Sequence, residues 1–261
     1  MDLRVVTLNL QGVANGWFDG RAAAAFDGLR RLEPDVVCLQ EVTIVPRREG
    51  MYDQTRAASE AIGLEHVAFA AHGWPEQQAT WRQDGLAVLA RWPLQQVSSV
   101  RLPTAPSDPP DGRVALRCRV VHPETEFDVV NAHLAWRPEE EATRLLQAEL
   151  ILDLFTLRGL GRQGHHGVLA GDINAVETEP VVRRMCQSLR DAWRELHPDE
   201  PGYTWLRSNP YTEGWDMPDR RLDYVFVPPG AELRDVRLAL DRPDPVWPSD
   251  HCAIVVDLHW D

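Results

Sequence analysis

The chain has 261 residues, of which 44% are hydrophobic and 26% charged, as in an ordinary globular protein with a sizeable core. The net charge is −13, from 40 acidic and 27 basic side chains, which argues against tight binding of duplex nucleic acid, because such binding needs a basic face. A zinc-thiolate site and a disulfide framework are also disfavoured, since the cysteines are scattered without CxxC spacing: Cys38, Cys118, Cys186 and Cys252.

Location and domain organisation are predicted from features that the sequence lacks. No run approaches the roughly 20 apolar residues of a membrane span, and no charged leader with an apolar signal region precedes the first predicted strand. We therefore expect a cytoplasmic protein without a transmembrane segment. No low-complexity linker divides the chain, so residues 1–261 are predicted to form a single domain. The sequence does not indicate an oligomeric state.

In chain order, apolar runs bounded by Gly, Pro or Asp predict many strands and few helices. Strands are expected at 3–9, 35–40, 65–71, 85–91, 94–101, 113–121, 126–132, 167–171, 222–227, 234–240 and 252–259. Helices are expected at 20–32, 54–62, 138–157 and 178–188. This order of elements suggests two sheets packed face to face with helices outside.

Polar residues close several of the apolar runs. The string LAGDIN (169–174) ends in Asp172 and Asn174, which point the same way in an extended backbone and can together orient a water molecule. The string PSDHC (248–252) places Asp250 and His251 just before another apolar run. Turn formation is the alternative explanation for both strings. Because carboxylates are rarely buried without a ligand or partner, the strings predict functional groups.

Asp223 lies inside the apolar run RRLDYVFV (220–227) and therefore needs a partner. A histidine is a natural partner, because the pair fixes the imidazole tautomer and favours its charged form. A salt bridge to Arg220 or Arg221 is the alternative. Three weaker candidates are Asn9 in TLNLQG (7–12), Glu41 at the end of VVCLQE (36–41) and His133 in VVNAHL (129–134). Acidic residues at several strand ends suggest convergence on a metal ion.

Taken in order, these strings resemble the endonuclease/exonuclease/phosphatase superfamily, which includes DNase I-like nucleases, neutral sphingomyelinases and inositol polyphosphate phosphatases. The resemblance covers almost the whole chain and rests on the blocks TLNLQG, LQEV, DGLAVLARWPL, VVNAHL, LAGDINA, RRLDYVFV and SDHCAIVVDL. It implies an α/β fold, a four-layered α/β/β/α sandwich of two mixed sheets flanked by helices. It also implies hydrolysis of phosphate esters with a divalent cation, Mg²⁺ or Mn²⁺. Oxygen-rich candidate ligands agree with a hard cation.

The resemblance implies a role for each matching residue. Glu41 would be the principal metal ligand, with Asn9 beside it and Asp250 supporting the site. Asp172 would orient and deprotonate the attacking water, and Asn174 would hold the phosphate. In the remaining roles, His251 would contact the scissile phosphate while polarised by Asp223, His133 would stabilise the phosphate or the leaving group, and Arg113 would bind phosphate.

The sequence leaves the substrate open among three hypotheses. A phosphodiesterase or phosphatase acting on a small or lipid-like substrate agrees with the acidic charge and with aromatic loops that could receive an apolar group or sugar. A nuclease acting on DNA or RNA is the second, since tryptophans stack on single-stranded bases. A scaffold that has lost catalysis is the third, and it predicts a substitution among the matching residues, of which there is none.

Loop residues are the candidates for substrate contact. Trp205 and Asn209 in GYTWLRSNPY (202–211) are predicted to bind substrate. Further loop tryptophans either line the site or anchor the loops: Trp74, Trp81, Trp136, Trp215 and Trp247. Arg207, Arg220 and Arg221 either contact a second phosphate or are solvated.

Overall fold

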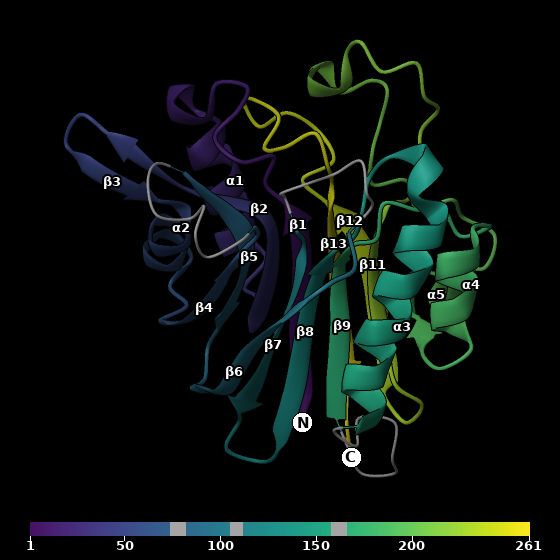
Figure 1. Ribbon diagram of the computed structural model, residues 1–261. Helices are drawn as coiled ribbons and strands as arrows, with labels where there is room; N and C mark the ends of the chain where they lie inside the picture. Colours follow the sequence, from purple (N-terminus) through teal and green to yellow (C-terminus); the bar gives the residue numbers. More distant parts are fainter. Residues whose placement is uncertain (74–81, 105–111, 158–165) are drawn as a thin grey trace.

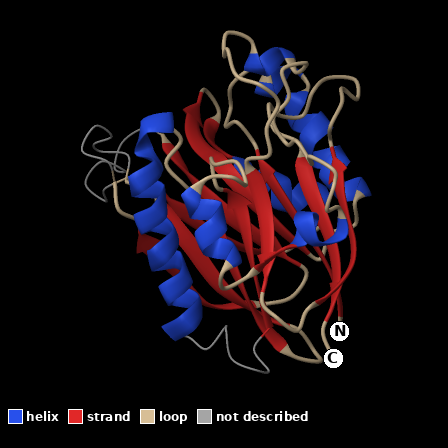
Figure 2. Ribbon diagram, turned by 90° about the vertical axis from the view of Figure 1, so that its right-hand side faces the viewer, coloured by secondary structure: helices blue, strands red, loops and turns tan. Residues whose placement is uncertain are grey.

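Several strands are apolar on both faces, which is typical of strands buried between two layers. The computed structural model describes residues 1–73, 82–104, 112–157 and 166–261. In these residues two mixed sheets pack face to face, with helices on both outer faces (Figures 1 and 2). The predicted four-layered α/β/β/α sandwich is confirmed.

The first sheet has the strand order β12-β13-β1-β2-β5-β4, and β3 pairs with β2 beside this path. Its strands are β1 (Asp2–Asn9), β2 (Val36–Arg47), β3 (Gly50–Asp53), β4 (His66–Ala71), β5 (Gln83–Ala90), β12 (Glu232–Ala239) and β13 (Ala253–His259). β1 and β2 are parallel, and the other described pairs of this sheet are antiparallel.

The second sheet has the order β10-β11-β9-β8-β7-β6. Its strands are β6 (Leu94–Arg101), β7 (Val114–Val121), β8 (Glu126–His133), β9 (His166–Asp172), β10 (Arg190–Asp191) and β11 (Asp223–Val227). Here β8 and β9 form the parallel pair among otherwise antiparallel described neighbours. Each sheet therefore has one parallel pair near its centre.

Helices cover the outer face of each sheet and make the crossover that each parallel pair requires. They are α1 (Arg21–Arg31), α2 (Gln54–Ile62), α3 (Glu141–Leu157), α4 (Pro180–Cys186) and α5 (Ala192–Leu196), with short 3-10 helices η1 (Trp17–Asp19), η2 (Pro138–Glu140) and η3 (Pro210–Thr212). α1 and α2 pack on the first sheet, and α3 and α4 on the second. Among the described helices, none is long and apolar enough to cross a membrane.

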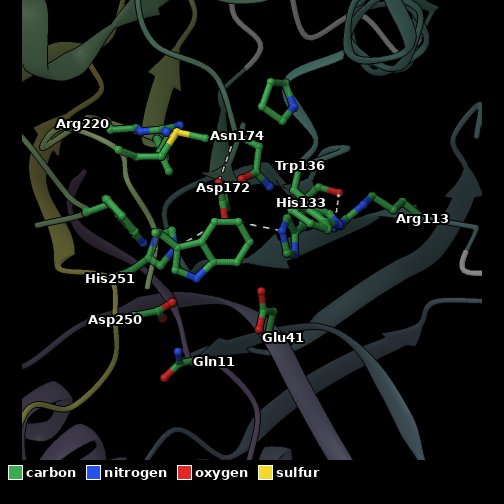
Figure 3. Close-up of a pocket in the computed structure, with 15 residues that line it drawn as sticks. Gln11, Glu41, Arg113, His133, Trp136, Asp172, Asn174, Arg220, Asp250 and His251 are labelled. Atoms are coloured by element: carbon green, nitrogen blue, oxygen red, sulfur yellow. Dashed lines mark hydrogen bonds and ion pairs between the residues drawn. The ribbon is translucent and has the colours of Figure 1, made fainter. Parts of the chain in front are cut away.

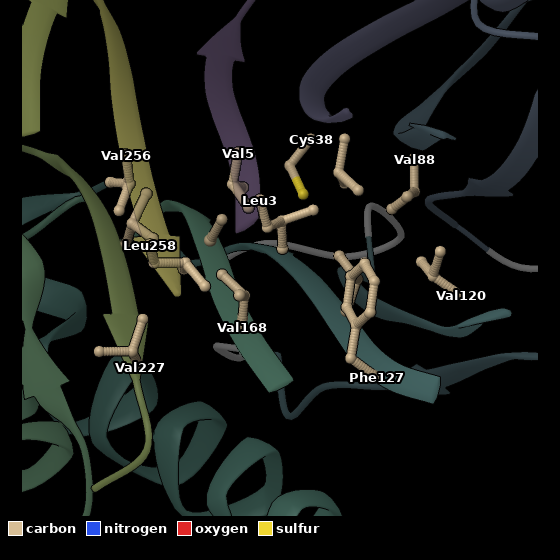
Figure 4. Packing of buried hydrophobic residues seen from close by; sticks show 14 of the residues in the cluster. Leu3, Val5, Cys38, Val88, Val120, Phe127, Val168, Val227, Val256 and Leu258 are labelled. Atoms are coloured by element: carbon tan, nitrogen blue, oxygen red, sulfur yellow. The ribbon is translucent and has the colours of Figure 1, made fainter. Parts of the chain in front are cut away.

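The two-residue period of the strands separates two kinds of core. Along β1, Leu3 and Val5 face the second sheet, whereas Val6 and Leu8 pack under the helices. Figure 4 shows the core between the sheets, where Val168 and Leu258 meet side chains from several strands. These side chains are almost completely buried, and burial of an aliphatic side chain contributes about 1.5–3 kcal/mol to stability.

The inward-facing rows become polar at one end of the sandwich. On β1 the row Leu3, Val5 continues to Thr7 and Asn9, and on β9 the row Val168, Ala170 ends in Asp172, as the two-residue period requires. The functional candidates on these strands therefore lie directly on top of the apolar core between the sheets.

Gly171 allows the parallel strands to approach each other next to Asp172. Its φ is +146°, and a Cβ added there would lie 2.0 Å from the backbone oxygen of Ala132 on β8. No larger residue fits this position without displacing backbone. A glycine immediately before the aspartate is thus a requirement of the strand packing.

Most of the predicted elements are confirmed, with local differences. β2 continues to Arg47 and forms a hairpin with β3, which the sequence analysis did not predict. The predicted helix 138–157 begins with a 3-10 turn, and the predicted helix 178–188 is limited to Pro180–Cys186. The short elements β10 and α5 were also missed, because two and five residues carry too little periodicity to detect.

Candidate active site

Strand direction brings the polar ends of the rows together. The carboxyl ends of the parallel strands β8 and β9 place His133 opposite Asp172. β11 runs antiparallel to β9, so its first residue, Asp223, pairs with Asp172. The same end of the second sheet therefore carries the side chains of His133, Asp172 and Asp223.

The first sheet delivers its candidates to the same end of the sandwich. β1 ends at Asn9, and its parallel neighbour β2 carries Glu41 just beyond the paired residue. β13 runs antiparallel to β1, so Asp250 and His251, which precede its first residue, lie at this end. Hydrogen bonds then join the two sheets: the Asn9 amide donates to Glu41 Oε1 over 3.1 Å and to Asp172 Oδ2 over 3.0 Å.

Asp172 is the centre of the cluster (Figure 3). Besides the bond from Asn9, its carboxylate accepts a 2.9 Å hydrogen bond from the backbone N–H of Asn174. Nε2 of His133 and Nε2 of His251 lie 3.4 Å and 3.9 Å from Oδ2. Burial and the nearby charge of Asp223 raise the pKa of Asp172 to about 7, although His251 and the hydrogen bonds oppose the shift. The carboxylate is therefore suited to exchange a proton at neutral pH.

His251 forms a buried pair with Asp223. The distance between His251 Nδ1 and Asp223 Oδ2 is 2.8 Å. Burial lowers the pKa of His251, but the carboxylates of Asp223, Asp250 and Asp172 outweigh it and hold the pKa well above the usual value. The pair thus keeps a cationic imidazole at the site with Nε2 directed toward Asp172. The partner of Asp223 is this histidine; Arg221, the alternative, is bound to Asp191 and Glu177 instead.

A bulge in β2 directs Glu41 into the site. The register between β2 and β5 shifts between Leu39 and Val42, and Glu41 has a φ of +52°. Such a conformation is strained for a residue with a side chain, and bulges often redirect side chains at functional sites. Burial and the charge of Asp250 raise the pKa of Glu41, while the hydrogen bond from Asn9 lowers it. Two carboxylates are therefore held close enough to repel each other.

His133 is kept neutral by its surroundings. It is 4% exposed, and burial together with the neighbouring Arg113 guanidinium and the His72 and His251 imidazoles lowers its pKa well below the usual value. Arg113 lies on the cleft wall and contacts the backbone oxygen of His133 at 3.5 Å. The site thus contains one charged and one neutral imidazole beside the same carboxylate.

A cleft of about 370 Å³ opens over these groups. Its lining residues are of two kinds. Nine are polar or charged: Gln11, Glu41, Arg113, His133, Asp172, Asn174, Arg220, Asp250 and His251. Six are aromatic or apolar: Trp136, Pro138, Trp205, Trp215, Met217 and Leu222. The rings of Trp136 and Trp215 meet edge to face with centroids 5.7 Å apart, and they are 42% and 51% exposed.

Comparison with known proteins gives the family of the chain. The model of the Endonuclease/Exonuclease/phosphatase family matches residues 6–251. The chain belongs to this family. Members of the endonuclease/exonuclease/phosphatase family hydrolyse phosphate esters, in agreement with the resemblance of the seven sequence blocks. No curated protein matches the chain.

Solved structures of family members and related proteins share the fold. An endonuclease/exonuclease/phosphatase from Beutenbergia cavernae is 28% identical with a TM-score of 0.76, and the match covers 99% of this chain and 72% of that one. The human Nocturnin catalytic domain, with bound sulfate anion, is 23% identical with a TM-score of 0.75, over 100% and 94% of the two chains. Truncated TDP2 from Caenorhabditis elegans is 18% identical with a TM-score of 0.75, over 99% and 98%.

The donor set of this family member fits a hard divalent cation. Glu41 and Asp250 line the cleft together, and burial and the charge of Asp250 raise the pKa of Glu41, two effects that a bound cation would offset. Among the described residues, Asp172, Asp223 and His251 also bring ligand atoms within 4.8 Å of one another. Asp223 and His251 bind each other, however, so Glu41 and Asp250 are the better candidates for ligands.

The structure brings most of the residues predicted from sequence into one place. The cleft is lined by Glu41, Arg113, His133, Asp172, Asn174, Trp205, Asp250 and His251. Asn9 and Asp223 lie behind this wall, where Asn9 bridges Glu41 and Asp172, and its Oδ1 accepts from the backbone of Gln11. Asn9 therefore positions two carboxylates, and both of its polar atoms have protein partners.

Asn209 does not line the cleft. Its amide donates to the backbone oxygen of Ser249 over 2.7 Å and its Oδ1 accepts from the backbone of Tyr211, so it anchors the loop that begins with η3. These bonds give Asn209 a structural role, and the substrate contact at Asn209 stays a prediction. Trp74 and Trp81 lie outside the described residues, and Trp247 is not among the lining residues.

Sequence reasoning missed one buried residue behind the site. The Arg21 guanidinium donates to the backbone oxygens of Gly12, Ala14 and Pro248, and thus ties the loop after β1 to the segment before Asp250. Burial lowers its pKa to about 10, and the charges of Asp250 and Glu41 act in the opposite direction. An arginine at the start of an Ala-rich helix gave no sequence signal for this role.

Proposed function

We propose that the protein is a Mg²⁺- or Mn²⁺-dependent hydrolase of phosphate esters that acts on a small or lipid-like substrate. The observation that carries the proposal is the position of Asp172 in a cleft that tryptophans also line. Asp172 lies between a cationic histidine and a neutral one, and the carboxylates of Glu41 and Asp250 line the same cleft. Within the family, this combination favours attack by water on a phosphorus atom held in the cleft.

Asp172 acts as the general base in the proposed reaction. Its pKa of about 7 means that a substantial fraction is ionised at neutral pH and can take a proton from an attacking water. Asn9 and the backbone of Asn174 hold the carboxylate in place, so its position does not depend on the substrate. A fixed base within reach of the water lowers the entropic part of the barrier.

His251 stabilises the negative charge that develops on the phosphoryl oxygens. Its pKa is held well above the usual value, so the imidazole is cationic before the substrate arrives. His133, which is neutral, and Arg113 face the same space and hold the phosphate or the leaving group. A divalent cation bound by Glu41 and Asp250 would polarise a phosphoryl oxygen.

The apolar residues of the cleft support a small or lipid-like substrate. Six of the lining residues are tryptophan, proline, methionine or leucine, and the rings of Trp136 and Trp215 are partly exposed. Ligand sites of this kind combine apolar walls with a few fixed polar groups. The net charge of −13 also opposes the approach of a long polyanion.

A nuclease is the second candidate function. The exposed rings of Trp136 and Trp215 favour it, since base stacking on tryptophan binds single strands without sequence preference. It would need local cations that overcome the acidic charge of the chain.

A substrate panel distinguishes the two candidates. We expect purified protein with Mg²⁺ or Mn²⁺ to cleave a generic phosphodiester, a phosphomonoester or a phospholipid, but not plasmid or single-stranded DNA. Cleavage should disappear with EDTA and in Asp172→Ala. Cleavage of DNA that shows the same two dependences would favour the nuclease instead, and cleavage that persists with EDTA would contradict the proposed metal dependence.

A further inference from the structure

Arg220 is a cleft residue whose guanidinium has no carboxylate of its own. It follows the loop that carries Trp215 and Met217, and its backbone pairs with Trp205. The side chain lies over the Trp205 ring, with Cζ 5.6 Å from the ring centroid. Within the described parts of the chain, its guanidinium has no hydrogen-bond acceptor and no salt bridge, and the charge that acts on it is that of Glu179.

Its neighbour Arg221, in contrast, is buried and has carboxylate partners within the fold. Arg221 is 3% exposed and forms ion pairs with Asp191 and Glu177 at 2.7 and 2.8 Å. The two arginines are adjacent in sequence, but on the extended backbone they point to opposite sides. Arg221 is held inside the fold by its two ion pairs, and Arg220 is directed to the cleft.

The carboxylate of Glu179 attracts Arg220 but already has other hydrogen-bond partners. One of its oxygens accepts from Arg144 over 2.9 Å, and the other accepts from the backbone N–H of Val176 over 3.0 Å. Burial lowers the pKa of Arg220, which means that its charge loses hydration without a full replacement. An anionic ligand in the cleft would supply that replacement.

We propose that Arg220 binds a second phosphoryl group of the substrate, so that the preferred substrates are small phosphate esters with two phosphoryl groups. The inference rests on the proposed function, because it takes the first phosphoryl group to lie at Asp172. In Figure 3, Arg220 lies on the side of Asp172 that is opposite to Glu41, well away from the candidate metal ligands. A planar guanidinium supported on a tryptophan face is suited to bidentate contact with phosphate oxygens.

Binding of non-hydrolysable phosphonates tests the assignment without requiring turnover. Isothermal titration calorimetry at fixed Mg²⁺ compares an alkyl phosphonate with the diphosphonate of the same chain, for chains of increasing length. At the best length, wild-type protein should bind the diphosphonate at least about tenfold more tightly, as one charge-assisted contact predicts. In Arg220→Gln this advantage should disappear while the affinity for the monophosphonate is unchanged.

Arg207→Gln is the matched control, because it removes the same charge from an exposed arginine that is not a lining residue of this cleft. It should retain the diphosphonate advantage. Equal affinities for the two ligands in wild-type protein, or an advantage that survives Arg220→Gln, would overturn the assignment. Hydrolysis of phosphate esters with one and with two phosphoryl groups by the same preparations is measured separately, so that an Arg220-dependent advantage without turnover of either ester would leave the subsite standing and refute the proposed hydrolase.

Discussion

At the scale of single residues, burial and close charges set the protonation of the site. Asp172 has a pKa of about 7, and the pKa of His251 is raised while that of His133 is lowered, although both histidines lie within 4 Å of the same Asp172 oxygen. The difference between the histidines follows from their partners: His251 is bound to Asp223, whereas His133 faces Arg113. A single cluster therefore holds a base, an acid and a neutral imidazole.

Glu41 is expected to control affinity for the metal. In Glu41→Gln one negative ligand becomes neutral, so the Mg²⁺ concentration for half-maximal hydrolysis should rise at least about tenfold, because ligand charge tunes affinity for hard cations. A Mg²⁺ titration of the hydrolysis rate measures this. Glu60→Gln on α2 removes the same charge at an exposed position and should leave the titration unchanged. Superimposable titrations for Glu41→Gln and wild type would refute its role as a ligand.

His133 should make the fold sensitive to acid. In the unfolded chain His133 binds a proton below a pH of about 6.5, whereas in the folded protein it does so only at much lower pH. Between these two pH values the unfolded state binds more protons, so the stability of the fold decreases as the pH falls. His133→Asn should flatten the dependence of the unfolding free energy just below pH 6.5 by up to about 1.4 kcal/mol per pH unit. Urea denaturation in EDTA measures it, and identical slopes for variant and wild type would contradict the account.

At the scale of elements, a buried polar network aligns the two sheets under the site. Asn131 on β8 donates to the backbone oxygens of Leu39 and Ala87 over 2.8 and 2.9 Å, and its Oδ1 accepts from Gln40 over 2.7 Å. Gln40 immediately precedes Glu41, and Asn131 is two residues before His133. The network thus fixes the β2 bulge of the first sheet relative to the second.

Removing this network should affect both stability and activity. Asn131→Ala removes three buried hydrogen bonds, although Gln40 keeps its bonds to Thr7 and to the backbone oxygen of Cys38, so we expect the unfolding free energy to fall by at least about 2 kcal/mol. The hydrolysis rate of the remaining folded protein should also fall, because Glu41 loses its alignment. Val129→Ala is the control: it removes packing from the same strand and should lower stability with little effect on the rate. A similar loss of rate in both variants would argue against an aligning role.

The elements also show what the sequence could reveal. The positions of Asn9, Asp172 and Asp223 were predictable, since Asn9 and Asp172 end apolar runs, Asp223 lies within one, and the two-residue period aims all three at the core between the sheets. The bulge at Glu41 and the hairpin of β3 were not, because they depend on pairing between strands distant in sequence. The structural role of Asn209 could not be predicted, because its partner, the backbone of Ser249, lies 40 residues away.

At the scale of the whole molecule, the sheets supply the polar groups of the site and the loops supply the aromatic residues of the cleft. The site lies at one end of the sandwich, where strands of both sheets end. Loops from the second half of the chain, which carry Trp136, Trp215 and Arg220, lie at the same end (Figure 1). Family relatives with TM-scores near 0.75 share the sheets, at identities between 18% and 28%. Loop side chains have no periodic pattern, which is why the aromatic residues of the cleft could only be suggested from sequence.

The most direct measurement of the central claim is the turnover of a simple phosphodiester by wild type, Asp172→Asn and Asp153→Asn, each with Mg²⁺ and with EDTA. Asp153 is an exposed carboxylate on α3 and serves as the matched control. We predict Mg²⁺-dependent turnover that falls about a thousandfold in Asp172→Asn, as expected for loss of a general base, and is unchanged in Asp153→Asn. Turnover by a folded Asp172→Asn protein at the wild-type rate would contradict the account.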